Sequence, residues 1–125
     1  MDIIKTGKAP TPVGPYSQAV RAGDFLFVSG QGPLDPITRK TVAADIESQT
    51  KQTIENVKAI LTAAELQLGN VVKVGVFLRD MNDFKRMNQV YSSYFTVNPP
   101  ARTTVQARLP IADWLIEIDV IACFV

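Results

Sequence analysis

Alternating apolar and polar positions predict two strands near the C-terminal end of the chain. In residues 101–109, Arg102 and the polar side chains at every second position after it point to one face. Residues 115–124 are almost wholly apolar but carry Glu117 and Asp119 on one face. An arginine and two carboxylates are unusual in so apolar a pair of strands, so we take this stretch as the candidate site.

The same patterns predict the rest of the secondary structure, with Asp45 as a suitable N-cap for the first helix. In chain order, we expect a short edge strand at residues 3–4, strands at 16–22 and 24–30, a helix at 45–66, a strand at 71–79, a helix from 82 or 83 to the Val97–Pro100 stop, and the two C-terminal strands. On the first helix, apolar residues at helical spacing predict one buried stripe: Ile46, Ile54, Val57, Ile60, Leu61 and Ala64. This helix shows no candidate functional residue. With no linker and no internal repeat, residues 1–125 predict a single α+β domain whose sheet carries two helices on one face.

The two faces of the predicted sheet differ in polarity. Strictly apolar positions belong under the helices: Val72, Val74, Val76, Leu78, Ile116, Ile118 and Val120. The other face mixes large apolar side chains with polar ones: Phe25, Phe27, Val71, Phe77 and Ile121, with Ser29, Lys73, Thr104, Glu117 and Asp119. Burying two such phenylalanines contributes roughly 3 to 6 kcal/mol, and an exposed apolar patch of that size indicates a partner surface. We therefore expect a homo-oligomer in which this face packs against its own copies.

Composition excludes several classes of chemistry. The chain has no His and one Cys, which excludes Ser-His-Asp and Cys-His catalysis, most zinc sites and an intrachain disulfide. No glycine-rich phosphate loop occurs, and we expect neither an organic cofactor nor a metal. The formal net charge of +1 provides no field that attracts nucleic acid. No apolar run is long enough for a membrane span or follows charges as in a signal peptide, so we expect a cytoplasmic protein without a membrane partner.

A pocket results if the polar positions share the open face of the sheet. Arg102 offers a planar fork for a carboxylate, and Ser29 and Thr104 offer neutral donors and acceptors. Glu117 can hold or activate a water, and Tyr16 can form an aromatic wall. Such a pocket suits a small carboxylate-bearing substrate that is attacked by water. Spacing alone leaves a second interpretation open, in which Arg102 and Glu117 form a buried structural salt bridge.

Short motifs along nearly the whole chain resemble one known family. They are Gly14-Pro15-Tyr16-Ser17-Gln18-Ala19, Phe27-Val28-Ser29-Gly30-Gln31, Pro33, Asn82-Asp83-Phe84, Asn88 with Tyr91, Pro100-Ala101-Arg102-Thr103-Thr104-Val105, Leu109-Pro110 and Ile116-Glu117-Ile118. Together they resemble the Rid family of reactive intermediate deaminases, also called YjgF. The resemblance implies a chorismate-mutase-like protomer with a mixed sheet. It also implies a homotrimer whose sheets line a central barrel, with three clefts between subunits.

The resemblance also implies an enzyme activity, which is the cofactor-independent hydrolysis of 2-imino acids and their enamines to 2-keto acids and ammonia. Substrates of the family are of the 2-aminoacrylate and 2-iminobutanoate type. In the family the arginine of the Pro-Ala-Arg motif binds the substrate carboxylate, and here this residue is Arg102. By the same resemblance, Thr104 contacts substrate or water through its backbone, and Glu117 helps to place the hydrolytic water. The implied substrate-binding residues are Tyr16, Ser29, Gly30, Gln31, Phe84 and Asn88.

Three alternatives to this activity are open at the sequence level. One keeps the reaction and changes the substrate to another enamine, such as 2-aminomuconate. The pocket rim around Phe84 and Trp114 would then determine which substrate is preferred. Another is a non-catalytic regulatory trimer that binds 2-keto acids through Arg102. The third is the RNA cleavage attributed to some family members. It is only weakly supported, because the net charge is +1 and the chain has no His.

Overall fold

Six strands form one mixed β-sheet in the computed structural model, which describes residues 1–125. The strands are β1 (Asp2–Ile4), β2 (Ala19–Ala22), β3 (Phe25–Gln31), β4 (Val71–Leu78), β5 (Ala101–Gln106) and β6 (Ile116–Cys123). Their order across the sheet is β1-β2-β3-β6-β4-β5, and only β4 and β5 pair in parallel. The predicted α+β fold with a mixed sheet is confirmed.

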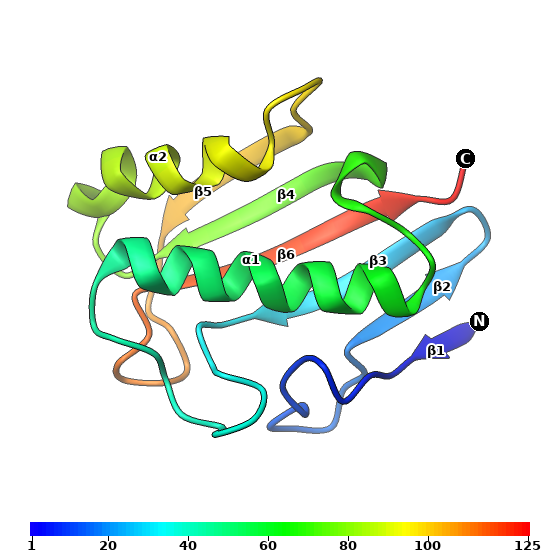
Figure 1. Ribbon diagram of the computed structural model, residues 1–125, viewed down its shortest axis with the longest axis horizontal. Coiled ribbons are helices and arrows are strands. Elements are labelled where there is room, and N and C mark those ends of the chain that lie inside the picture. Colours follow the sequence, from blue (N-terminus) through cyan, green and yellow to red (C-terminus); the bar gives the residue numbers. More distant parts are fainter.

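Both helices lie on the same face of the sheet (Figure 1). Helix α1 (Ile46–Ala63) connects β3 to β4, and helix α2 (Phe84–Tyr94) connects β4 to β5. Strands β3, β4 and β5 run in the same direction, because β3 and β4 are both antiparallel to β6. Crossovers between parallel strands are right-handed. Two such crossovers that advance in the same direction across the sheet therefore place both helices on one side.

Local sequence determines where α1 begins, and its apolar stripe determines which side it buries. The Asp45 side chain accepts a hydrogen bond of 2.7 Å from the backbone N–H of Ser48 and caps the helix, as predicted. The predicted apolar stripe, from Ile46 to Ala64, is buried against the sheet. The helix ends at Ala63, three residues before the predicted limit, and Glu65 then adopts a positive φ of 62°.

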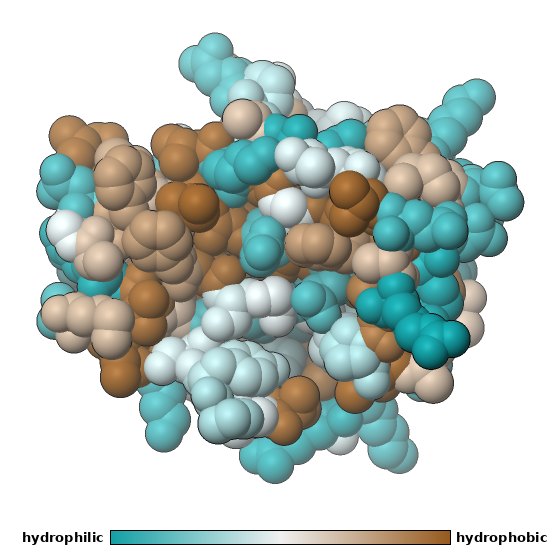
Figure 2. Space-filling model, turned by 180° about the vertical axis from the view of Figure 1, so that it is seen from behind, coloured by the Kyte–Doolittle hydropathy of each residue, from teal (hydrophilic) through white to brown (hydrophobic).

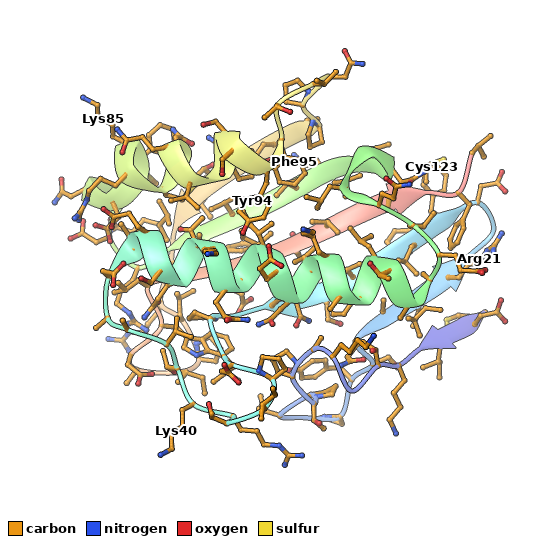
Figure 3. All side chains as sticks on the ribbon, in the orientation of Figure 1. Arg21, Lys40, Lys85, Tyr94, Phe95 and Cys123 are labelled. Atoms are coloured by element: carbon orange, nitrogen blue, oxygen red, sulfur yellow. The ribbon has the colours of Figure 1, made fainter.

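Short 3₁₀ turns flank β4 and α2. They cover Leu68–Asn70 and Met81–Asp83, so α2 begins at Phe84, one or two residues after the predicted start at Asn82 or Asp83. The two helices contact each other, and the Tyr94 hydroxyl of α2 donates a 2.8 Å hydrogen bond to Glu55 of α1. Figure 3 shows the Tyr94 side chain at this junction between the helices. Burial and the neighbouring Glu55 raise the pKa of Tyr94 to about 12.

The start of β4 departs from the predicted alternation. We predicted Val72 under the helices and Val71 on the other face, and this is wrong. Val71 is 5% exposed and belongs to the core, whereas Val72 is 44% exposed. The pairing of β4 with β6 shifts register between Val71 and Lys73. A bulge at this point reverses the phase of the strand, and the positions from Val74 onward follow the prediction.

Two predicted strands are shorter than expected. The strand predicted at residues 16–22 begins at Ala19, since the Gln18 amide donates to the carbonyls of Thr6, Ala9 and Pro10 and holds the preceding segment as a loop. The strand predicted at 101–109 ends at Gln106. The next residue still bonds to the end of β4, because the Ala107 N–H donates a 2.9 Å hydrogen bond to the Leu78 carbonyl.

The face of the sheet opposite the helices is open. Figure 2 shows this side of the molecule, where apolar side chains gather between polar ones. Phe25, Phe27 and Val105 are each at least 40% exposed. The predicted oligomer would cover these side chains, and it stays a prediction. None of the helices combines the length and the apolar character that crossing a membrane requires.

Candidate functional site

Arg102 lies on the second position of edge strand β5, on the face covered by α2. Its guanidinium carbon is 4.6 Å from the ring centre of Tyr91 and 5.6 Å from that of Phe84. Cation–π contacts of this kind orient the group without using its N–H donors. Arg102 is half-buried, and the three ion pairs in the structure do not include it. The guanidinium group of Arg102 is therefore held in place with its N–H donors free for an anionic ligand.

Helix α2 and strand β5 supply the surroundings of this arginine. Phe84, Asn88 and Tyr91 follow one another at i, i+4 and i+7 and so lie along one side of the helix. Thr104 shares the face of Arg102 on β5, and its hydroxyl is buried without a hydrogen-bond partner. We call Phe84, Asn88, Arg102 and Thr104 the arginine niche.

Tyr91 is a further member of these surroundings, although from the sequence we named it only as part of a family motif and not as a site residue. It is 7% exposed, and its hydroxyl has no hydrogen-bond partner. Burial raises the pKa of the Tyr91 phenol, and the Arg102 charge beside it opposes that rise. The signal in the sequence was the spacing of seven residues from Phe84. That spacing equally describes a core position, so it could not reveal the contact with Arg102.

Glu117 lies on β6, opposite Phe77 of β4, on the open face of the sheet. Its carboxylate rests against Gly30 so closely that a Cβ atom at this glycine would overlap the Glu117 Oε2 atom. Glycine is therefore required at position 30 for the carboxylate to lie there. Burial raises the pKa of Glu117, and the charge of Asp119 adds to that rise.

The segment around Gly30 is irregular and tied to the preceding loop. A register shift between Val28 and Gln31 interrupts the pairing of β3 with β6. The Ser29 hydroxyl donates a 2.6 Å hydrogen bond to the Ser17 carbonyl, and the Gln31 amide donates one of 3.2 Å to the Ser29 carbonyl. Tyr16, Gly30 and Gln31 line a cavity of about 20 Å³, enough for about one water. We call Tyr16, Ser29, Gly30, Gln31 and Glu117 the glutamate corner.

The prediction that all the polar positions share the open face is wrong. Arg102 and Thr104 pair with Val74 and Val76, whose side chains point toward the helices, whereas Glu117 points to the other face. The alternation predicted within β5 and β6 is right, but the neighbouring strands determine which face each set occupies. A structural salt bridge between Arg102 and Glu117 is absent as well. Within one chain the arginine niche and the glutamate corner lie on opposite faces of the sheet.

Trp114, which we expected at the pocket rim, lines the same small cavity as Tyr16, Gly30 and Gln31. It is 5% exposed, and its indole ring lies against Gly32, where no Cβ atom would fit. Trp114 therefore packs against the segment that directly follows Gly30 and Gln31 of the glutamate corner. No group of three or more His, Cys, Asp and Glu residues in the chain could hold a metal ion.

Comparisons with known proteins give consistent matches over almost the entire chain. A family model described as "Endoribonuclease L-PSP" matches residues 6–124. A RutC family protein of Pyrococcus horikoshii is 55% identical over 122 residues, which cover 97% of this chain and 96% of the relative. The 2-iminobutanoate/2-iminopropanoate deaminase of Salmonella typhimurium is 47% identical over 123 residues, which cover 95% and 94%. The crystal structure of the YjgF gene product of E. coli has a TM-score of 0.93 at 43% identity, with 98% of each chain covered.

Proposed function

Because the chain belongs to the Rid (YjgF) family, we propose that it hydrolyses reactive 2-imino acids and their enamines to 2-keto acids and ammonia. The name of the Salmonella relative supports an imine deaminase at the level of the family. The observation in this chain that carries the proposal is Arg102. A half-buried guanidinium that is oriented by two aromatic rings and has no protein carboxylate beside it suits the carboxylate shared by all these substrates.

The arginine niche binds and orients the substrate. Two parallel N–H donors of Arg102 hold the carboxylate, which fixes the plane of the adjacent imine carbon. Phe84 is 39% exposed and offers an apolar wall for the substrate side chain. The Thr104 backbone and Asn88 supply polar contacts at the side of the niche.

The glutamate corner supplies the water. The raised pKa of Glu117 brings its carboxyl group closer to neutral pH, where it can both accept and return a proton. The reacting form is the protonated imine, whose carbon–nitrogen double bond opens to a neutral amine as Glu117 takes a proton from water and the oxygen bonds to the carbon. Glu117 returns this proton to the amine nitrogen through its water. The carbon–nitrogen bond then breaks as the hydroxyl proton passes to Glu117, ammonia and the 2-keto acid leave, and ammonia takes up the released proton. The reaction consumes one water and needs no redox partner.

The two halves must come from different copies of the chain, because they lie on opposite faces of one sheet. We propose a homotrimer in which the arginine niche of one subunit meets the glutamate corner of its neighbour. The apolar open face, with Phe25 and Phe27 more than 40% exposed, supplies the surface for this assembly. A head-to-tail contact of two different surfaces is the type that closes into rings.

The experiment that tests the proposal couples an amino-acid oxidase, which forms 2-imino acids in place, to the purified protein. Semicarbazide traps the imine that survives. We expect the wild type to lower the trapped signal, and Arg102→Ala to lose at least about tenfold in activity, since a hydrogen-bonded charge contributes about 1.5 to 3 kcal/mol. Arg108→Ala is the matched control, because Arg108 is exposed and lies beyond the end of β5.

A wild type that leaves the signal unchanged with small and large imino acids would contradict the deaminase proposal. Calorimetry with a 2-keto acid would then identify a regulatory binding protein, and an assay with 2-aminomuconate would identify a different enamine substrate. The description of the matching family model names an endoribonuclease, so the same preparation is also incubated with RNA. RNA cleavage that survives Arg102→Ala would belong to a separate activity.

A further inference from the structure

Helix α1 carries two buried amide side chains on the side that faces the sheet. Gln49 is 0% exposed and Asn56 is 1% exposed. They lie seven residues apart and so on the same face of the helix. Neither side chain is needed for the apolar stripe, and burying an amide is unfavourable unless its donors and acceptors are matched. Both amides are matched, and their partners lie in the two segments that form the glutamate corner.

Gln49 holds the turn that precedes β6. Its amide nitrogen donates a 2.9 Å hydrogen bond to the Asp113 carbonyl, and its amide oxygen accepts one of 2.7 Å from the Leu115 N–H. From the other side, the Arg79 guanidinium donates to the Trp114 carbonyl at 2.6 Å and to the Ile111 carbonyl at 2.8 Å. Leu115 is two residues before Glu117, so this anchoring fixes the backbone from which the carboxylate extends.

Asn56 holds the segment that follows β3. Its amide nitrogen donates to the Gly32 carbonyl at 3.0 Å and to the Leu34 carbonyl at 2.8 Å. The Gln52 amide donates a 2.9 Å hydrogen bond to the Asn56 oxygen and so fixes the orientation of the amide. Gly32 is two residues after Gly30.

The two anchored segments meet at Trp114. Its indole ring lies against Gly32 with no room for a Cβ atom, while its own carbonyl is held by Arg79. The position of Gly30 relative to Glu117 is therefore set by two amides on one rigid helix and by the ring between the segments. The carboxylate of Glu117 rests against Gly30, so a small displacement of either segment would move it.

We propose that Gln49 and Asn56 are positioning residues for the reaction, and that they place the Glu117 carboxylate and its water. This inference rests on the proposed function. The Gln49 amide donates to one backbone group and accepts from another at the same time, which an apolar side chain cannot do. An apolar side chain of the same size would leave the backbone groups of both segments without partners.

The test uses Gln49→Met and Asn56→Leu, which keep the size of each side chain and remove its hydrogen bonds. Thr53→Val is the matched control, because Thr53 is equally buried on the same helix and its hydroxyl bonds to neither segment. We expect both variants to lower kcat about tenfold or more, since small misplacements of reacting groups cost that much. The affinity for a 2-keto acid should stay within about twofold, because Arg102 holds that ligand in the other half of the site.

A second measurement does not depend on activity. Trp114 is the one tryptophan of the chain, so its fluorescence reports the contact with Gly32 directly. We expect acrylamide to quench it more strongly in both variants than in the wild type and in Thr53→Val. Should Gln49→Met fail to fold, Asn56→Leu carries the test alone, since it removes the anchoring of the segment that follows β3.

Folded variants with unchanged kcat would overturn the inference. So would variants in which kcat and keto-acid affinity fall by the same factor, because that result indicates a general disturbance. A wild type without deaminase activity refutes the proposed function instead. In that case unchanged Trp114 quenching in the variants also refutes the positioning, and increased quenching supports it.

Discussion

At the scale of single residues, the two central charged groups share an unusual property. Arg102 and Glu117 are both half-buried, and neither forms an ion pair within the chain. Partial burial of a charge without a partner lowers stability, because solvation is lost and nothing replaces it. Of the three ion pairs of the chain, Lys58–Glu55 and Arg86–Glu47 join exposed side chains and contribute little, whereas Arg86–Asp83 gives a largely buried carboxylate its partner. Charges held at a cost to stability are typical of a ligand site.

This cost predicts how stability depends on pH. Because burial raises the pKa of Glu117 above its ordinary 4.5, the folded chain binds this proton more tightly than the unfolded chain. The contribution is complete below pH 4.5 and is lost as pH rises through the raised pKa. We expect Glu117→Gln to reduce the fall in Tm between about pH 4 and about pH 8, and to abolish deaminase activity.

Thermal unfolding at a series of pH values provides the measurement. Asp45→Asn is a control whose effect on the pH dependence of Tm has the opposite sign, because the hydrogen bond from the Ser48 N–H lowers the pKa of Asp45. That contribution is present above the ordinary value of 3.8 and is lost as pH falls. Parallel Tm curves for the wild type and Glu117→Gln would contradict the assignment.

At the scale of elements, sequence periodicity predicted the features that depend on nearby residues. It did not predict the face of a strand, which depends on the neighbouring strands. The stripe on α1 and the Asp45 cap follow from interactions within a few residues, and both are confirmed. The alternation within β5 was also right, since Arg102 and Thr104 do share a face. The face itself follows from the pairing of β5 with β4, a contact between residues far apart in sequence. No pattern within one strand contains that information.

The bulge at the start of β4 shows the same limit in another form. Two adjacent valines are equally apolar, so their sequence does not reveal which one points inward. The structure buries Val71 and exposes Val72. We expect Val71→Ala to lower the free energy of unfolding by about 2 kcal/mol. Val72→Ala serves as the matched control and should change it by less than about 0.5 kcal/mol. Denaturant unfolding measures both, and equal losses would place the bulge elsewhere.

At the scale of the whole molecule, the separation of the arginine niche from the glutamate corner has a direct consequence. A chain with a defective niche still has an intact corner, and the reverse also holds. If each site joins the niche of one subunit to the corner of the next, two inactive variants can complement each other. Random mixing of Arg102→Ala and Glu117→Gln chains should restore roughly a quarter of the sites, since each half is intact in one chain out of two.

The complementation experiment mixes the two variants by unfolding and refolding them together, and measures imine hydrolysis. Arg102→Ala mixed with Arg102→Lys is the control, and it should restore nothing, because every niche is then defective. Light scattering records the number of chains in each assembly. A mixture of Arg102→Ala and Glu117→Gln that stays inactive while forming trimers would show that the site is not shared in this way.

The position of β6 also matters for how the chain acquires its fold during synthesis. It is the last strand in chain order, yet it lies inside the sheet between β3 and β4. The β1–β3 unit and the β4–β5 pair therefore leave the ribosome before the strand that joins them, each with an unpaired edge. Glu117 arrives with that same strand. A nascent chain that lacks Ile116–Cys123 has neither a closed sheet nor a glutamate corner, so fold and site are completed in one late event.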